Sequence, residues 1–181
     1  MEPVTVSFLT TGTDYADCKT AAMRAAMRRG EAVAFRVSGA AVVLLAFALM
    51  LFDGGSVLRG VLYILLALLG FAACGFPDVL LPLIVRFRAL KEYESGKSRI
   101  PAQTVEFHED FIAFLSEHYN ARIPYDMLFR AYEDDRIFIF YLGIGEMRFV
   151  PKRSMDDDGC KTVRGLLAAR LKDKFQQEGA H

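Results

Sequence analysis

Two long apolar runs, separated by only four residues, constrain this chain more than any other feature of its sequence. The first run is Ala32–Phe52 and the second is Val57–Phe76. A helix rises about 1.5 Å per residue, so roughly 20 apolar residues cross the ~30 Å hydrocarbon core of a bilayer. Lipid offers backbone groups no hydrogen-bonding partner, which forces such runs to be helical. The sequence therefore predicts a transmembrane helical hairpin, with spans at about 32–52 and 57–76.

The alternative is a pair of buried helices in a soluble all-α domain. Soluble helices of this length normally carry a polar face, and these runs have none. Each run has one charge near its first turn, Arg36 and Arg59, and no charge lies at mid-span. Five small residues would allow close contact between the two helices: Gly39, Ala40, Ala46, Gly70 and Ala73.

The charges that flank the runs predict the topology. Five basic residues lie before or at the start of the first span: Lys19, Arg24, Arg28, Arg29 and Arg36. Five more follow the second span: Arg86, Arg88, Lys91, Lys97 and Arg99. The positive-inside rule then places both termini in the cytoplasm.

Composition excludes several classes of protein. Lys and Arg together number 22, as do Asp and Glu, and this zero net charge argues against a nucleic-acid binder. Cys18, Cys74 and Cys160 share no spacing motif. We therefore expect no disulfide framework, no metal site and no cofactor.

The segment before the first span, residues 1–30, contains a strand and a helix. Val4–Leu9 alternates apolar and polar residues, and such a lone strand is expected to join a sheet formed later in the chain. Asp14–Arg29 has the period of an amphipathic helix, which Thr11 or Thr13 can cap. This helix lies on the membrane surface or packs on the soluble domain, and the sequence does not distinguish the two.

The second span is followed by a helical extension that completes the hairpin segment, residues 31–95. Pro77 and Pro82 should kink or interrupt this helix. Residues 96–181 then form a small cytoplasmic domain.

Regularly spaced short strands predict an antiparallel β-domain in residues 96–181. The strands are Thr104–Phe107, Phe111–Ser116, Asn120–Ile123, Met127–Glu133, Arg136–Leu142 and Glu146–Val150. A closing helix follows, with a capping box at Ser154 and Asp157. Its apolar stripe would cap the β-domain and consists of Val163, Leu167, Leu171 and Phe175.

Four short stretches resemble the YcxB-like proteins of bacteria. They are VSFLTTGTDY at Val6–Tyr15, VEFHEDFIAF at Val105–Phe114, ARIPYDML at Ala121–Leu128 and RFVPKRSM at Arg148–Met155. Where that family tends to have tryptophan after isoleucine-proline, this chain has Tyr125. The resemblance implies an α+β protein of the bacterial cytoplasmic (inner) membrane, with a transmembrane hairpin and a C-terminal domain similar to pleckstrin-homology (PH) domains.

Pro151-Lys152-Arg153 is the one basic cluster placed between elements of the predicted β-domain. Lys152 and Arg153 could hold a lipid phosphate or an acidic partner, or they could form a solvated corner between a strand and a helix. PH domains that bind phosphoinositides usually place basic residues around the first hairpin. Here that turn is acidic, His108-Glu109-Asp110, which argues against recognition of an inositol lipid.

The strand Arg136–Leu142 is apolar on both faces. It is either a central strand buried on both sides or a strand with one bare face. In the second case Phe138, Phe140 and Leu142 would form a surface that contacts a protein or a membrane.

The sequence contains no nucleophile elbow, phosphate-binding loop, dinucleotide glycine pattern or zinc motif, so we do not expect an enzyme. We expect a non-catalytic, inner-membrane-anchored PH-like module that binds a protein partner or self-assembles at the cytoplasmic face. The alternative is a protein that binds or handles anionic lipid.

Overall fold

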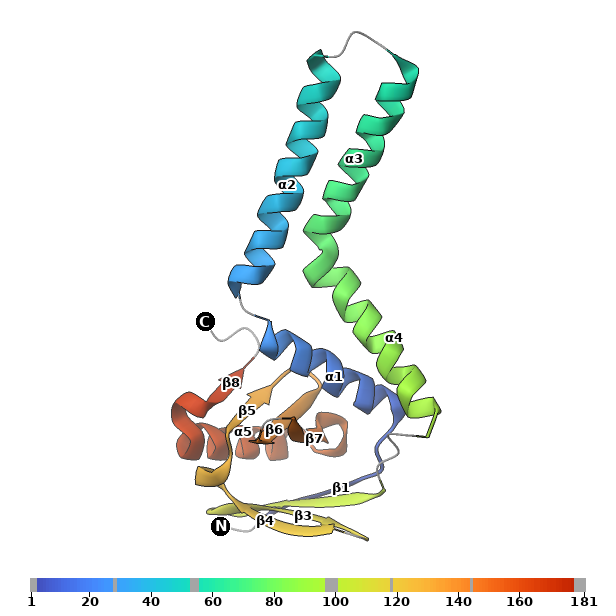
Figure 1. Ribbon diagram of the computed structural model, residues 1–181. Coiled ribbons are helices and arrows are strands. Elements are labelled where there is room, and N and C mark those ends of the chain that lie inside the picture. Colours follow the sequence, from blue (N-terminus) through green and yellow to red (C-terminus); the bar gives the residue numbers. More distant parts are fainter. Residues whose placement is uncertain are drawn as a thin grey trace. The chain divides into compact units, whose positions relative to one another are not determined.

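The computed structural model describes residues 3–27, 29–52, 56–96, 101–117, 119–143 and 145–177 (Figure 1). The chain divides into two compact units, which we call the hairpin unit (Met23–Val85) and the β unit (Met1–Ala22 with Arg86–His181). This division groups the N-terminal strand and most of the following helix with the C-terminal domain. Residues 53–55 of the predicted connecting turn and residues 97–100 lie outside the described residues.

Two apolar helices form the hairpin unit. Helices α2 (Arg29–Phe52) and α3 (Val57–Gly75) are both long and apolar enough to cross a membrane. A π-helical turn, η1 (Phe76–Leu80), contains Pro77 and joins α3 to α4 (Leu81–Glu94). The predicted irregularity at Pro77 is therefore present as a π turn within a continuous helix, because a π turn accommodates the missing proline N–H.

Glycines set the distance between α2 and α3. A Cβ atom added to Gly39 would lie 2.6 Å from the carbonyl oxygen of Gly70 and 2.7 Å from the backbone nitrogen of Cys74. A Cβ atom added to Gly70 would lie 2.8 Å from the carbonyl oxygen of Gly39. The two backbones thus touch where neither residue has a side chain, as expected for helices that pack in lipid.

An ion pair links α2 to η1 in the hairpin unit. The guanidinium of Arg36 donates to both carboxylate oxygens of Asp78, at 2.8 to 3.1 Å. The sequence pattern shows Arg36 only as a charge near a helix end and gives no sign of this partner, which lies 42 positions further along the chain.

The β unit contains two four-stranded sheets. The first has the order β1-β2-β3-β4 and is antiparallel throughout: β1 (Val4–Phe8), β2 (Gln103–Phe107), β3 (Phe111–Ser116) and β4 (Tyr119–Pro124). The second has the order β7-β6-β5-β8: β5 (Arg130–Glu133), β6 (Ile137–Gly143), β7 (Glu146–Pro151) and β8 (Phe175–Gln177). Its strands β5, β6 and β7 are antiparallel, whereas β8 runs parallel to β5.

Two details of the strand prediction are wrong. The strand predicted from Met127 begins only at Arg130, because Tyr125–Met127 forms a 3-10 turn, η2, that points Tyr125 into the core. Phe175, predicted as the end of the helical stripe, belongs to β8 instead.

The N-terminal strand joins the later sheet, as predicted. Strand β1 pairs with β2 so that Val6 lies opposite Val105 and Phe8 opposite Gln103. In the order of the chain, the whole hairpin unit therefore lies between β1 and β2, which are neighbouring strands of one sheet.

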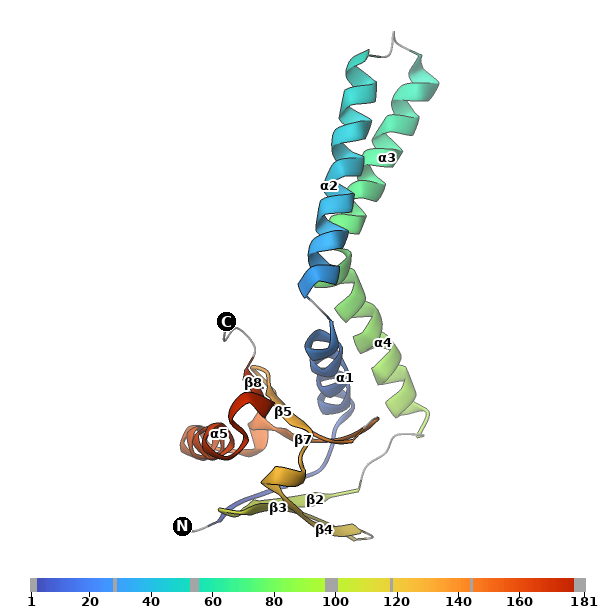
Figure 2. The same ribbon diagram turned by 60° about the vertical axis from the view of Figure 1, so that its left-hand side comes forward.

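The core of the β unit lies between its two sheets, where aromatic rings meet. Phe140 of β6 contacts Phe107 and Phe114 of the first sheet, with ring centroids 5.9 and 6.1 Å apart. Figure 2 shows the two sheets as separate layers, with β2, β3 and β4 in one and β5 and β7 in the other.

Helix α5 (Asp157–Leu171) buries three residues of its predicted stripe against this core: Val163, Leu167 and Leu171. The predicted capping residue is wrong. Asp156, not Ser154, caps the helix, and its carboxylate accepts from the backbone N–H of Gly159 at 2.8 Å. Ser154 instead ends a 3-10 turn, η3 (Lys152–Ser154).

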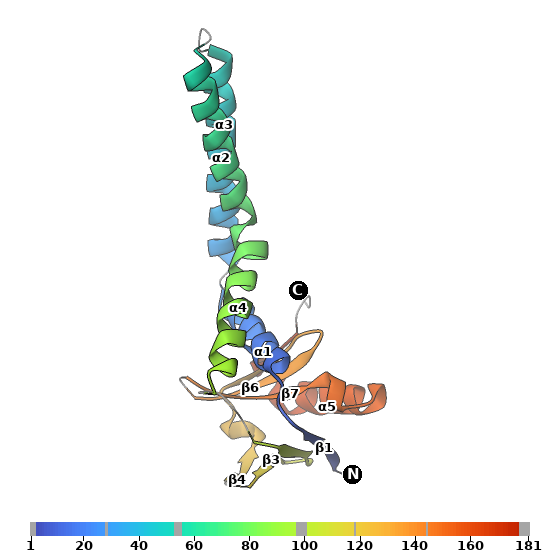
Figure 3. The same ribbon diagram turned by 90° about the vertical axis from the view of Figure 1, so that its right-hand side faces the viewer.

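Helix α1 (Gly12–Ala26) packs within the β unit, where its Tyr15 and Ala16 form a buried cluster with Ala89 of α4. Figure 3 shows its first turns beside β6 and β7, on the side away from β3. Its residues Tyr15, Ala16, Cys18 and Ala21 are buried. Of the two placements that the sequence left open for this helix, the structure shows packing on the β unit.

Candidate functional site

Two acidic residues of α1 form the centre of a cluster that we call the charged junction: Asp14 and Asp17 with Arg86, Arg136 and Arg153. A capping box fixes the start of α1, because the backbone N–H of Asp14 donates to the hydroxyl of Thr11 at 3.2 Å. In return the Asp14 carboxylate accepts from the backbone N–H of Thr11 at 2.8 Å. This local geometry places both carboxylates on the side of α1 that faces the sheet.

Asp14 binds Arg153 of η3. The Nε and Nη2 of Arg153 donate to its two carboxylate oxygens at 2.8 and 2.6 Å, and Nη2 also donates to the carbonyl of Leu9. Burial raises the pKa of Asp14, but hydrogen bonds from Arg153 and Thr11 lower it more, so the net pKa lies below its ordinary value. Arg153, a predicted lipid contact, therefore also holds α1 on the β unit.

Asp17 is shared by two arginines. Arg86 of α4 donates to one carboxylate oxygen at 2.8 Å, and Arg136 donates to the other at 3.5 Å. The Asp17 side chain is 17% exposed, whereas 65% of the Arg136 side chain is exposed. One carboxylate thus orients two guanidinium groups, and the Arg136 group is held only loosely.

Lys152, the other predicted basic contact, belongs to a second cluster. Its ammonium donates to the buried Glu133 at 2.6 Å and lies 4.9 Å from the ring centroid of Phe138. Arg164 of α5 binds the same carboxylate, again at 2.6 Å. Burial raises the pKa of Glu133, but Arg164 and Lys152 lower it more, so the net pKa is below the ordinary value. Lys152 is therefore committed to an internal ion pair.

The predicted apolar surface on β6 is not bare. Phe138 and Phe140 are both 0% exposed and form part of the core, and only Leu142 is partly exposed. The alternative reading, a central strand buried on both faces, is the correct one. The two neighbouring strands, the first sheet and α1 together cover β6, and the sequence of one strand cannot reveal such coverage.

A different apolar feature is exposed on the β unit, and it was not predicted from the sequence. Met127 and Phe129, which we call the apolar pair, are 70% and 67% exposed, whereas Leu128 between them is fully buried. Met127 ends the 3-10 turn η2 and Leu128 is extended, and this local turn buries Leu128 while both neighbours remain exposed. Lys174 donates to the carbonyl of Leu128 at 3.1 Å and fixes this segment.

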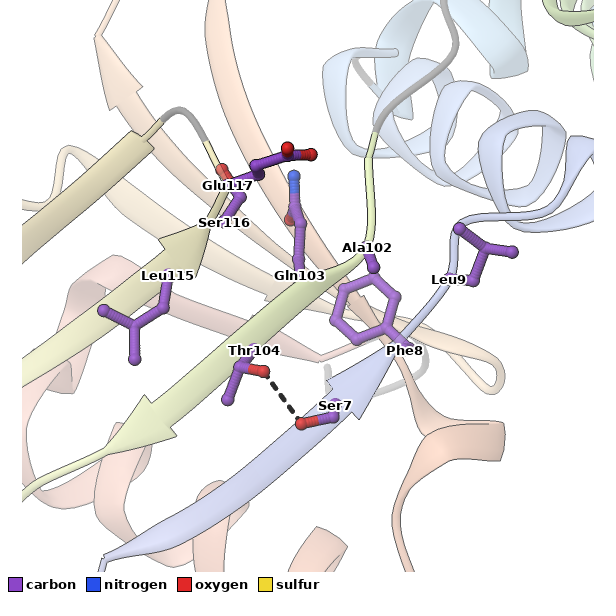
Figure 4. Close-up of a pocket in the computed structure, with 9 residues that line it drawn as sticks. All are labelled: Ser7, Phe8, Leu9, Ala102, Gln103, Thr104, Leu115, Ser116 and Glu117. Atoms are coloured by element: carbon purple, nitrogen blue, oxygen red, sulfur yellow. Dashed lines mark hydrogen bonds between the residues drawn. The ribbon is translucent and has the colours of Figure 1, made fainter.

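A shallow, open groove of about 550 Å³ lies where β1, β2 and β3 meet (Figure 4). Ser7 and Thr104 line it and share a hydroxyl hydrogen bond of 2.8 Å. Leu9 at its rim is 64% exposed. No titratable side chain except Glu117 lines the groove, which makes it poorly suited to acid–base chemistry.

The part of the chain that the structure describes holds no group of three or more His, Cys, Asp or Glu residues that could bind a metal ion. Burial raises the pKa of the Cys18 thiol to about 12, so this cysteine is not a nucleophile at neutral pH. His108 stacks on Phe111 and contacts Glu106 at 3.0 Å, which makes it part of a surface turn.

The fold defines a class of α+β protein in which a hairpin of two apolar helices interrupts a two-sheet β unit closed by a helix. The family of YcxB-like proteins matches residues 107–162, from the end of β2 into α5, and this confirms the resemblance predicted from the sequence. No curated protein and no solved structure matches the chain.

Proposed function

We propose that this protein is a non-catalytic binding module, anchored in the bacterial inner membrane by its hairpin unit. Its PH-like β unit would lie at the cytoplasmic face and bind a protein partner or a second copy of the chain. Three observations support the proposal: the apolar hairpin, the topology of the β unit and the exposed apolar pair.

The hairpin unit supports the membrane anchor. Its helices α2 and α3 have 24 and 19 residues. At about 1.5 Å per residue both lengths are close to the thickness of a bilayer core. Most of their large apolar side chains are exposed, including Phe47, Leu62 and Phe71, and lipid would cover them.

The insertion of the hairpin between β1 and β2 is the observation that carries the proposal. Residues 4–8 and 103–107 pair in one sheet, so they must lie on the same side of any membrane that the intervening helices cross. Two spans satisfy this condition, and the basic flanks favour the cytoplasmic side. The β unit is then built directly at the membrane surface, where a binding module acts.

The strand order supports a PH-like domain. An antiparallel meander of four strands is followed by one of three strands and then by a C-terminal helix that covers the core. The additional strand β8 comes after that helix.

The apolar pair is the surface that we assign to a protein partner. Two large exposed apolar side chains cost free energy in water, and their burial against another protein would be favourable. Asp126 beside them is exposed and provides a polar rim, as interfaces usually have.

The experiment is photo-crosslinking in living cells, with a photoreactive amino acid at Met127 or Phe129 of the full chain. The control position is Asp158, whose side chain is 87% exposed on α5. We expect a defined crosslinked species from positions 127 and 129 that is absent from position 158. Identical patterns at all three positions would contradict the assigned surface, and recovery of the chain without detergent in the aqueous fraction would contradict the membrane anchor.

A further inference from the structure

The charged junction surrounds a cavity of about 370 Å³ in the β unit. Four basic side chains from three separate segments line it: Arg86 of α4, Arg136 in the turn before β6, and Lys152 and Arg153 of η3. Three acidic side chains line it as well: Asp14, Asp17 and Asp135. We propose that this cavity binds a phosphate group through Arg86, Arg136 and Arg153, and that the phosphate belongs to a lipid headgroup.

The arginines are oriented but not saturated. A guanidinium offers five N–H donors in a planar fork that fits two oxygens of a phosphate. Arg136 places one donor towards Asp17, at a long 3.5 Å, and its side chain is largely exposed. Arg86 donates to the same carboxylate through Nη1, so Asp17 serves two cations with one negative charge. An anion in the cavity would accept donors that Asp17 leaves unused.

The acidic residues act as supports in this arrangement. Asp14 fixes the plane of Arg153 through two hydrogen bonds, and Asp17 brings Arg86 and Arg136 together. Binding sites for charged groups need such support, because a flexible arginine loses side-chain entropy when a ligand orders it. Lys152 contributes less, since Glu133 already holds its ammonium.

A phosphate is favoured over a single carboxylate by the number of arginines that line the cavity. Three forks present more donors than one carboxylate can accept, whereas a phosphate offers additional oxygens and comparable or greater charge. Four basic and three acidic side chains line the cavity, so its formal net charge is +1.

The headgroup is favoured as the source because of where Arg86 lies in the chain. It follows directly on the apolar segment Val79–Val85, and the next residue, Phe87, is 70% exposed. If the hairpin spans the bilayer, as the proposed function requires, the second span ends near Phe76, and Arg86 follows ten residues, roughly 15 Å of helix, further on, at the face of the membrane where the headgroups lie. This part of the inference rests on the proposed function, whereas the phosphate site itself does not.

The test uses the full chain in an uncharged detergent at constant ionic strength, with its thermal unfolding followed by circular dichroism. Three additives are compared: short-chain phosphatidylglycerol, short-chain phosphatidylcholine and inorganic phosphate. We expect phosphatidylglycerol to raise the unfolding midpoint in a saturable manner. Arg136→Gln should weaken the apparent affinity about tenfold, the effect of losing one charge-assisted hydrogen bond. The matched control is Lys161→Gln, which removes one exposed charge from α5.

Each outcome separates the possibilities. A response to phosphatidylglycerol but not to phosphate supports a headgroup site, and a response to both supports a site for the phosphate group as such. The proposal is overturned if neither phosphatidylglycerol nor inorganic phosphate shifts the midpoint. It is also overturned if Arg136→Gln and Lys161→Gln weaken the response equally. Membrane extraction is assayed separately, so failure of the anchor with an intact phosphate response would refute the proposed function alone.

Discussion

The hairpin unit and the β unit are held together by opposite means. In the hairpin unit two glycines, Gly39 and Gly70, let backbones touch because a side chain is absent. In the β unit large side chains fill the interior, and Phe138 and Phe140 are fully buried. The hairpin unit is stabilised by close approach of two helix backbones, whereas the β unit is stabilised by large side chains that fill its interior.

The charged groups of the two units differ in the same way. The Arg36–Asp78 pair of the hairpin unit is about half exposed on both sides. The carboxylates of Asp14 and Glu133 in the β unit are 6% and 5% exposed, and each is held by basic side chains from other elements. Breaking a buried pair leaves a polar group without compensation, so charge changes should matter most in the β unit.

The largest expected effect is that of replacing Phe140 with alanine, because the neighbouring side chains cannot fill the cavity that this leaves in the aromatic core. Phe140→Ala should lower the free energy of unfolding of the β unit by about 3–5 kcal/mol. Urea unfolding of the full chain in detergent, followed by near-ultraviolet circular dichroism, measures this change. The matched control is Phe129→Ala on the exposed apolar pair, which should change stability by less than about 0.5 kcal/mol. Equal losses from the two variants would refute the assignment of Phe140 to the core.

Local patterns were sufficient to predict much of this fold. Alternation identified β1, and its lack of a sequence neighbour indicated that it would pair with a later strand, as it does with β2. Run length identified both apolar helices, and Gly39 and Gly70 were among the five small residues expected to allow close helix contact, although their pairing was not predicted. These features depend on periods within one segment, which the sequence displays directly.

Features that depend on partners distant in the chain were not predictable. Nothing near Asp17 indicates Arg136, which lies 119 positions away. Strand β8 pairs in parallel with β5 through only three residues, too few for a recognisable alternation. The prediction for Phe138 and Phe140 left burial open, because it depends on what other elements cover β6. The charged junction is assembled from α1, α4, the turn before β6 and η3, and only Arg153 of its members was predicted as a contact residue.

Acid should destabilise the β unit selectively, and this is the next largest effect. The pKa values of Asp14 and Glu133 lie below their ordinary values of 3.8 and 4.5 in the folded chain. Because these pKa values are lowered by folding, the carboxylates of the unfolded chain take up protons at a higher pH than those of the folded chain. The ion pairs therefore contribute their full stability above the ordinary pKa values, and this contribution is lost as the pH falls through the pKa values of the folded chain. Urea midpoints measured between pH 7 and pH 3 should therefore decline below about pH 5. A flat profile would contradict the assigned ion pairs. The Gly39–Gly70 contact does not titrate, so the hairpin helices should persist.

A single substitution at the charged junction should have a smaller effect. Asp14→Asn keeps the shape of the side chain but removes the charge that holds Arg153, which should cost the β unit about 1–2 kcal/mol. The same variant should also reduce the loss of stability at low pH. The control is Asp158→Asn on α5, where the carboxylate is 87% exposed and little change is expected. If both variants unfold at the same urea concentration as the parent chain, Asp14 does not hold α1 on the sheet.

The smallest effect concerns the contact that distinguishes the hairpin unit. Gly39→Ala adds a methyl group that would meet backbone atoms of α3 at 2.6 and 2.7 Å, so the helices must separate. Helix association in membranes is worth only about 1 kcal/mol per such contact, and the loss should be of that order. It can be measured as a lower dodecyl sulfate concentration at the midpoint of hairpin opening, reported by energy transfer between dyes on the two helices. Gly60→Ala is the matched control, since a Cβ atom there meets nothing within 4 Å. In the β unit the effect of an added methyl group depends on the volume available to it, whereas between α2 and α3 it depends on the distance between two backbones. Equal dodecyl sulfate midpoints for Gly39→Ala and Gly60→Ala would show that the packing of α2 on α3 does not depend on Gly39.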